Sequence, residues 1–184
     1  LNAEGRKVAS SWDPAKDKIS GEDCRAYGAP SIMRVPGRLY IHWASDNVLQ
    51  LDTDSGSQTR LFRFDAGGGA STAAPSWQGQ STAVWEGAGG RGGQGRLSGQ
   101  LKVTTRRLRP GYLRRNGVPY SANAVVEEYF EAFTEPNGDN WLLVTSIVTD
   151  PTYLTQPYAT TVQFKKIPER SGWDPTPCRG DLAR

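Results

Sequence analysis

The chain has 184 residues, enough for one full domain and barely enough for two. Apolar residues make up 36% of it and it contains 21 glycines, a composition typical of a β-rich protein with long loops rather than of a helical one. The net charge is +3, and no run of about eighteen apolar residues is present, so the sequence predicts no membrane-spanning helix.

Residues 1–36 show no strong hydrophobic periodicity, and we expect them to form an irregular arm. The Trp-Asp-Pro stretch at residues 12–14 returns at residues 173–175, near the other end of the chain. Because the shared stretch is so short, it indicates two tails stopped by proline, each with a buried or stacked tryptophan, rather than a duplicated unit.

Residues 37–64 give the clearest strand signals. Leu39, Ile41 and Trp43 alternate with their neighbours, and the Asp-Ser-Gly sequence at 54–56 is typical of a hairpin turn. We expect three strands here, over residues 38–44, 47–53 and 57–65.

The next part of the chain mixes glycine-rich segments with strand patterns. Residues 66–74 and 87–95 are too poor in apolar side chains to hold a core element, so we expect loops that gate an entrance. Strands are predicted over residues 76–86 and 96–108. Further along, Asn-Gly at 116–117 is a strong hairpin signal.

Residues 122–134 fit two interpretations. Alanine and glutamate favour a helix, and Val126, Phe130 and Phe133 lie at helical spacing. A strand would instead complete an antiparallel meander with two further predicted strands, over residues 140–149 and 157–167, and we favour the strand for that reason.

Together these segments predict an all-β protein, an eight-stranded antiparallel up-and-down barrel with irregular N- and C-terminal tails. An interior bounded by eight strands is either just filled by side chains or holds one small ligand. We expect an N-terminal arm over residues 1–36, a barrel domain over 37–168 and a C-terminal tail over 169–184.

Cys24 and Cys178 are the two cysteines of the sequence, and neither belongs to a Cys-x-x-Cys pair. A disulfide that ties the C-terminal tail back to the N-terminal arm explains both; two unrelated free thiols are the alternative. Because such bonds persist in oxidising compartments, the sequence predicts a secreted or periplasmic protein. Two cysteines cannot alone form a structural zinc site, and we expect no metal and no cofactor.

The stretch NGDNWLLVTSIVTDPTYLTQPYATTVQFKK resembles a pattern in exported bacterial proteins with a lipocalin-like (calycin) barrel. In those proteins a strand that ends in Asp-Pro is followed by a tyrosine and then by a Pro-led strand rich in threonine and aromatic residues. The resemblance covers residues 36–168 and implies a lipocalin-like barrel and an exported protein. It implies no catalytic residue, because these relatives are largely of undefined function.

Five arginines form a local basic cluster, namely Arg106, Arg107, Arg109, Arg114 and Arg115. Such a cluster is typical either of a patch that binds anions or nucleic acid, or of a solvated hairpin. No nucleic-acid-binding motif accompanies it, so we expect no nucleic-acid partner.

Four residues are candidates for acid–base chemistry. His42, the single histidine, would act as a general base oriented by Asp52 or Asp54. Glu128, if it points into the barrel, would act as an acid or base, or would anchor a substrate if an inward arginine keeps it ionised. Arg60 would stabilise developing charge. The alternatives are an ordinary surface histidine and surface carboxylates in cross-strand ion pairs.

A wider set of aromatic and polar side chains is predicted to line or rim a ligand cavity. These candidates are Tyr40, Trp43, Gln50, Phe62, Trp77, Tyr112, Arg114, Tyr120 and Tyr129. For each of them, packing within the barrel or its loops is the alternative.

The function expected from these features is a secreted barrel that binds a small apolar or aromatic molecule in its interior. One alternative is a cofactor-independent lyase, isomerase or cyclase acting on a small organic substrate in the same cavity. Another is a protein-interaction module that uses the basic hairpin. The sequence leaves the ligand and the oligomeric state open.

Overall fold

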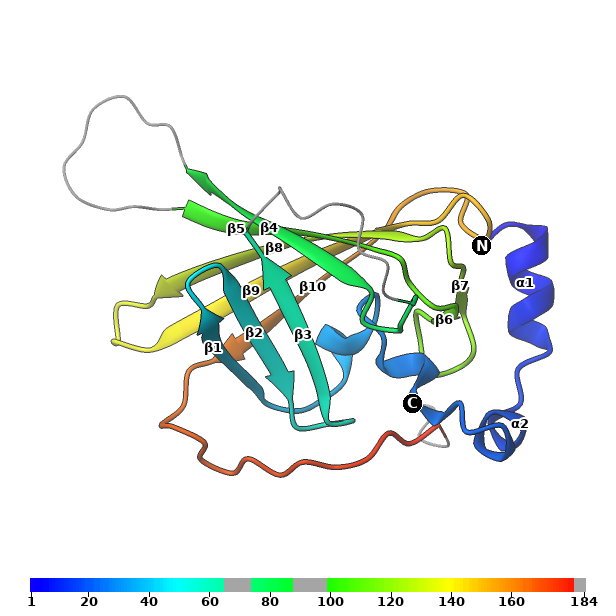
Figure 1. The fold of residues 1–184 in the computed structure, drawn as a ribbon, viewed down its shortest axis with the longest axis horizontal. Helices are drawn as coiled ribbons and strands as arrows, with labels where there is room; N and C mark the ends of the chain where they lie inside the picture. The colour runs from blue at the N-terminus through cyan, green and yellow to red at the C-terminus, as the bar shows by residue number, and fades with distance from the viewer. Residues whose placement is uncertain (65–73, 88–98, 181–184) are drawn as a thin grey trace.

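The computed structural model describes residues 1–64, 74–87 and 99–180. The predicted entrance loops fall mostly on residues 65–73 and 88–98, so their expected gating role lies outside the described residues. In the described part, eight strands form one curled sheet in the order β1-β2-β3-β4-β5-β8-β9-β10, and β6 and β7 form a separate hairpin (Figure 1).

The strands agree closely with the predicted segments. Those of the large sheet are β1 (Leu39–Ser45), β2 (Val48–Thr53), β3 (Gln58–Arg63), β4 (Gln80–Gly87), β5 (Gly99–Arg106), β8 (Val125–Thr134), β9 (Asn140–Thr149) and β10 (Tyr158–Lys165). The small hairpin consists of β6 (Gly111–Tyr112) and β7 (Pro119–Tyr120), and it encloses the predicted Asn-Gly turn, where Gly117 has a positive φ of 79°.

The ambiguous segment 122–134 contains a strand, as favoured from the sequence. β8 pairs with β9 over its full length, from Val125 opposite Thr149 to Thr134 opposite Asn140. Val126, Glu128 and Phe130 are buried, whereas the residues between them are only partly buried. This period of two shows that tertiary pairing outweighs the helix propensity of alanine and glutamate.

The sheet is a half-barrel and differs in two respects from the expected closed, antiparallel barrel. First, β3 and β4 are parallel and overlap by only two residue pairs, Phe62 with Ser81 and Arg63 with Thr82. Second, within the described residues β1 pairs only with β2, and β10 only with β9, so both end strands keep an open edge. The short parallel overlap is the main-chain link between the first three strands and the other five (Figure 1).

The expected irregular arm contains two α-helices, α1 (Ala3–Ser10) and α2 (Pro14–Ile19), and two 3₁₀ turns, η1 (Asp23–Tyr27) and η2 (Ile32–Arg34). Asn2 caps α1 by accepting a hydrogen bond from the Gly5 amide. Asp13 caps α2, with Pro14 at its first position. These cap signals are visible in the sequence, but both helices are too short to show an apolar stripe.

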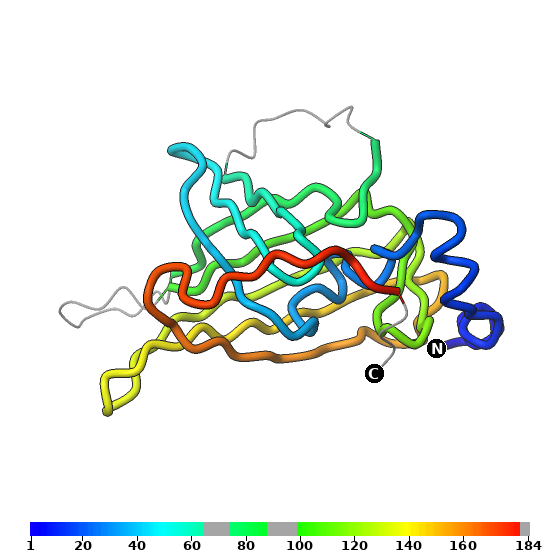
Figure 2. The backbone as a smooth tube through the Cα atoms, turned by 90° about the horizontal axis from the view of Figure 1, so that it is seen from below, coloured from blue at the N-terminus to red at the C-terminus, as the bar shows by residue number. Residues whose placement is uncertain are grey.

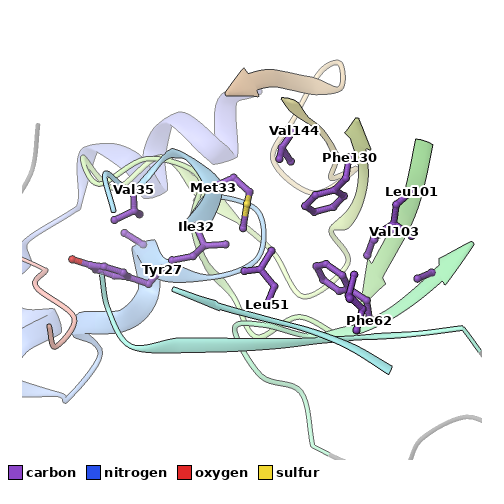
Figure 3. Close-up of a cluster of buried hydrophobic side chains, with 13 residues drawn as sticks. Tyr27, Ile32, Met33, Val35, Leu51, Phe62, Leu101, Val103, Phe130 and Val144 are labelled. Atoms are coloured by element: carbon purple, nitrogen blue, oxygen red, sulfur yellow. The ribbon is translucent and has the colours of Figure 1, made fainter. Parts of the chain in front are cut away.

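The core lies on the concave face of the sheet, where η1 and η2 cover one end of the half-barrel (Figure 3). Met33 and Tyr27 of the arm belong to the same cluster as Leu51 of β2 and Phe130 of β8. The Phe62 and Phe130 rings lie 5.5 Å apart, between centroids, in a tilted arrangement. The deep part of the half-barrel is therefore filled by its own side chains.

The C-terminal segment (residues 166–180) runs back along the molecule, across the space between the first strands and the last strands (Figure 2). The Thr176 amide donates to the Asp54 carbonyl at 2.9 Å, beside the β2–β3 turn. Cys178 then forms the predicted disulfide with Cys24, across a sequence separation of 154 residues. The tail is thus fastened to the arm, as the sequence predicted.

Removal of the disulfide is expected to destabilise the protein. The Cys24→Ser/Cys178→Ser variant should lose about 2–5 kcal/mol of unfolding free energy, toward the upper end because the closed loop is long. Urea denaturation followed by tryptophan fluorescence measures this loss. Reduction of the wild type should cause a comparable loss; a difference below about 1 kcal/mol in both experiments would contradict the prediction.

Candidate functional site

Glu128 pairs with an inward arginine, one of the alternatives that the sequence left open for this residue, and both side chains are completely buried. Arg60 on β3 donates from Nη1 to Glu128 Oε1 at 2.9 Å, and its Nη2 contacts Oε2 in a bidentate ion pair. The exposed fraction of each side chain is 0%. The guanidinium also lies 4.9 Å from the centroid of the Phe62 ring.

Hydroxyl groups complete this buried polar layer. Thr105 on β5 accepts from Arg60 Nη2 at 3.2 Å and is 2.7 Å from the hydroxyl of Ser81 on β4. Ser146 on β9 lies 3.5 Å from Glu128 Oε1. The layer joins five strands, but bulk solvent does not reach it. The pair lies within the core, and neither side chain lines the groove or the arginine pocket described below.

His42 and Asp52 lie on the convex face of the sheet instead. The His42 Nδ1 atom is 3.9 Å from Asp52 Oδ2, and the two side chains are partly exposed. The Asp52 carboxylate accepts hydrogen bonds from Gln50 and, at 2.6 Å, from the Thr59 hydroxyl. Asp54 instead accepts from the Arg38 amide at 2.7 Å and fixes the start of β1.

The predicted common lining is therefore divided between two faces of the sheet. In the β1–β2–β3 register, Tyr40 is opposite Asp52 and His42 is opposite Gln50, so these four share the convex face. Arg60 is opposite Leu51 on the concave face, and Phe62 lies there with it. The prediction treated each strand separately, and a one-residue offset in register exchanges the two faces.

A large open groove lies between the edges of β1 and β10. Its volume is about 1000 Å³, and the C-terminal segment lines one side of it. The apolar and aromatic side chains that line it are Leu39, Tyr40, Ile41, Phe133, Trp141, Leu142, Phe164, Ile167 and Trp173. Because the missing pairing between β1 and β10 creates this groove, the strand segments alone could not reveal it.

One wall of the groove is an aromatic cluster with a cation. The Tyr40 ring packs against Trp173 at 6.3 Å in an edge-on arrangement, and the Arg170 guanidinium lies 4.4 Å from the Tyr40 centroid. Tyr40 was a predicted ligand residue. Trp173 was expected only to stack, and its Trp-Asp-Pro motif was the one signal that marked it.

The groove lining is rich in positive charge. It holds Arg38, Lys165, Lys166 and Arg170, and among the described residues Glu169 is its one carboxylate. Arg38 pairs with Asp54 at 3.5 Å, and Lys165 pairs with Asp139. Lys166 and Arg170 form no ion pair with any described residue. Both are therefore available to a negatively charged group.

Trp43 and Trp85 lie on the concave face at the open end of the half-barrel. Their side chains flank Phe64, with ring centroids at 5.3 Å and 5.9 Å from it. Trp43 is 52% exposed and Trp85 is 56% exposed. This aromatic row was predicted in part, through Trp43, but neither tryptophan lines the groove.

The other predicted ligand residues are separated from the groove. Trp77 donates to the Pro110 carbonyl and lies beside Arg109, and Tyr129 on β8 lies 5.4 Å from the Lys102 ammonium. Tyr120 is fully buried beneath the arm, and burial raises its pKa above the ordinary value. These placements correspond to packing, the alternative considered for each.

Tyr112 joins the β6–β7 hairpin to the arm. Its hydroxyl donates to Asp17 Oδ2 at 2.8 Å, and Arg25 donates to the other Asp17 oxygen at 2.9 Å. Burial, together with the hydrogen bond to Asp17, raises the pKa of Tyr112 to about 12. The side chain thus fastens α2 to the hairpin.

Three members of the arginine cluster contact aromatic rings. Arg109 lies over Trp77 and pairs with Glu22, Arg115 lies over Tyr27, and Arg114 contacts Tyr158. The cluster is thus partly structural, because these side chains connect the hairpin region to the arm and to β10.

No family model, curated protein or solved structure matches the chain. None of the helices among the described residues has the length and apolar character needed to span a bilayer. The described residues also contain no group of three histidine, cysteine or acidic side chains arranged to hold a metal ion.

Loss of the buried carboxylate charge of Glu128 is expected to destabilise the folded protein. Glu128→Gln should lower the unfolding free energy by about 3–5 kcal/mol, because it leaves the Arg60 guanidinium without its counter-charge. The adjacent Glu127→Gln is a matched control, since Glu127 is exposed and pairs with Lys102 at 3.2 Å on the other face. Glu127→Gln should lower the unfolding free energy by less than about 1 kcal/mol.

Urea denaturation measures both changes. The Arg60→Met/Glu128→Leu double variant should be more stable than Glu128→Gln, because no buried charge remains. If Glu127→Gln and Glu128→Gln are equally stable, breaking the buried Arg60–Glu128 pair does not destabilise the fold as expected.

The pKa of Tyr112 predicts a loss of stability at high pH. The folded-state pKa is about 12, above the ordinary 10.0, so the unfolded chain loses this proton first. The stabilisation that the protonated Tyr112 hydroxyl gives the folded protein is complete below about pH 10 and disappears as the pH rises toward about 12. Unfolding free energies measured from pH 8 to 11.5 should therefore fall less steeply for Tyr112→Phe than for the wild type. If the unfolding free energies of the two proteins fall in parallel with pH, the Tyr112 hydroxyl is not the group that causes the loss of stability.

Proposed function

We propose that the protein binds a small amphipathic molecule, aromatic or apolar with one negative group, in the groove between β1 and β10. The observation that carries the proposal is the groove itself, about 1000 Å³ in volume, with aromatic side chains along its wall and uncompensated cations on its rim. Small-molecule sites typically combine a mostly apolar lining with a few placed polar groups.

The location differs from the barrel interior expected from the sequence. The deep interior is occupied by Phe62, Phe130 and the Arg60–Glu128 pair, which leave no room for a ligand there. The groove is the opening that the half-barrel leaves at its edges. Apolar contact with Phe164 and Trp173 would supply affinity, and Lys166 and Arg170 would orient an anionic group.

The protein is also proposed to be exported. The Cys24–Cys178 disulfide supports this, because such bonds persist in oxidising compartments. The resemblance of residues 36–168 to exported bacterial barrel proteins supports it as well.

The binding proposal is tested with 8-anilinonaphthalene-1-sulfonate, an aromatic anion whose fluorescence rises in apolar surroundings. We expect saturable binding to one site. Trp173→Ala removes an aromatic wall of the groove and should weaken binding about tenfold, the effect of losing roughly 1.4 kcal/mol of contact energy. The double variant Lys166→Gln/Arg170→Gln should weaken binding of the sulfonate and leave the fold unchanged.

Trp85→Ala is the control, because Trp85 is also a tryptophan, is more exposed than the half-buried Trp173, and lies outside the groove. It should bind the probe as the wild type does. If Trp85→Ala abolishes binding and Trp173→Ala does not, the concave open end is the binding surface and the groove proposal fails.

A further inference from the structure

A second, smaller pocket lies on the other side of η2, between the arm and the β6–β7 hairpin. Its volume is about 260 Å³, and three arginines line it, namely Arg34, Arg114 and Arg115. Its other lining residues are neutral.

Two of the arginines converge on one phenol oxygen. Arg34 donates from Nη1 to the Tyr158 hydroxyl at 3.0 Å, and Arg114 donates from Nε to the same oxygen at 3.3 Å. Each guanidinium carbon lies less than 6 Å from the Tyr158 ring centroid, at 5.8 Å and 5.7 Å. A single neutral group thus holds two positive charges close together.

Neither of these arginines has an acidic partner in the described structure. The remaining contact of Arg34 is a hydrogen bond from Nη1 to the Leu113 carbonyl at 2.7 Å. Each guanidinium has five N–H donors in a planar fork, so most of their donors are left for a ligand. Two like charges held this close repel each other, and a bound anion would relieve that repulsion.

The backbone fixes this arrangement in advance. Arg34 ends η2, which packs into the core, and Arg114 lies in the turn closed by the hydrogen bond from the Gly117 amide to its carbonyl at 3.2 Å. Tyr158 begins β10 and is tied to the large sheet. Three separate elements therefore hold the donors in place before a ligand arrives, which lowers the entropic cost of binding.

We propose that this pocket is a binding site for a tetrahedral oxyanion, a phosphate or sulfate group, held by the guanidinium groups of Arg34 and Arg114. Arginine is the preferred partner of such groups, because its planar fork matches two oxygens of the anion at once. The pocket volume exceeds that of an inorganic anion, so a phosphate group attached to a small organic molecule also fits. The site is independent of the groove and of the function proposed for it.

Inorganic phosphate is the first probe, titrated by calorimetry into the full chain at constant ionic strength set with sodium chloride. We expect saturable binding of one phosphate, with sulfate competing for the site and chloride failing to replace it. Arg114→Gln should lower the phosphate affinity about tenfold or more, the effect of one charged hydrogen bond. Arg114→Lys keeps the charge but loses the fork, and should be intermediate.

Arg106→Gln is the matched control. It removes the same charge from the same arginine cluster, but Arg106 is exposed and lies outside the pocket. It should bind phosphate as the wild type does. Equal losses for Arg106→Gln and Arg114→Gln, or no saturable binding by the wild type, would overturn the proposal.

Phenyl phosphate distinguishes the source of the anion. Binding tighter than inorganic phosphate, and lost in Arg114→Gln, assigns the site to an organic phosphate, whereas equal affinities assign it to the free anion. Because Arg114 also contacts Tyr158, the thermal unfolding midpoint of each unliganded variant is measured in parallel; lost phosphate binding in a variant that is still folded at the assay temperature separates loss of binding from loss of the fold.

Discussion

The buried ion pair between Arg60 and Glu128 is the interaction on which the half-barrel depends. The main-chain connection between the first three strands and the remaining five is weak, since β3 and β4 share only two residue pairs. The ion pair crosses the interior and links β3 directly to β8, and Thr105 adds a hydrogen bond from β5. Burying two charges has an unfavourable desolvation free energy. The bidentate geometry and the hydroxyl partners offset part of it, and the pair fixes which strands face each other. The apolar layer of Phe62 and Phe130 then packs beside it.

The same topology produces the cavities at the surface. A closed barrel would pair β1 with β10 and leave no edge groove, whereas the half-barrel keeps the two edges apart and lets the C-terminal segment border the gap. The arm and the β6–β7 hairpin cover the other end, and the Arg34–Arg114 pocket lies where they meet. The groove is lined by strands of the large sheet together with the C-terminal segment, whereas the arginine pocket is lined by the arm and by the turn of the β6–β7 hairpin.

Local sequence patterns were sufficient to predict the strands and the disulfide, because period-two alternation and turn residues are properties of neighbouring positions. They could not predict that β4 starts beside the end of β3, since that pairing depends on contacts far apart in the sequence. The faces of β2 and β3 relative to each other depend on the same kind of contact, so the sequence groups Gln50 with Phe62 although they lie on opposite faces. An inward arginine beside Glu128 is one of two alternatives that the sequence offers, with surface ion pairs as the other, and only three-dimensional packing shows that the residue is completely buried.

The disulfide closes residues 24–178 into a covalent ring that contains the whole large sheet. A mechanical load applied to the two ends of the chain would therefore pass directly through the Cys24–Cys178 bond and bypass every strand. Tension on the ends would stretch only the short segments outside the ring, beginning with α1 and α2. The contacts that would break first on the N-terminal side are the hydrogen bonds from Asn2 to the carbonyls of Thr152 and Tyr153, which lie outside the covalent connection.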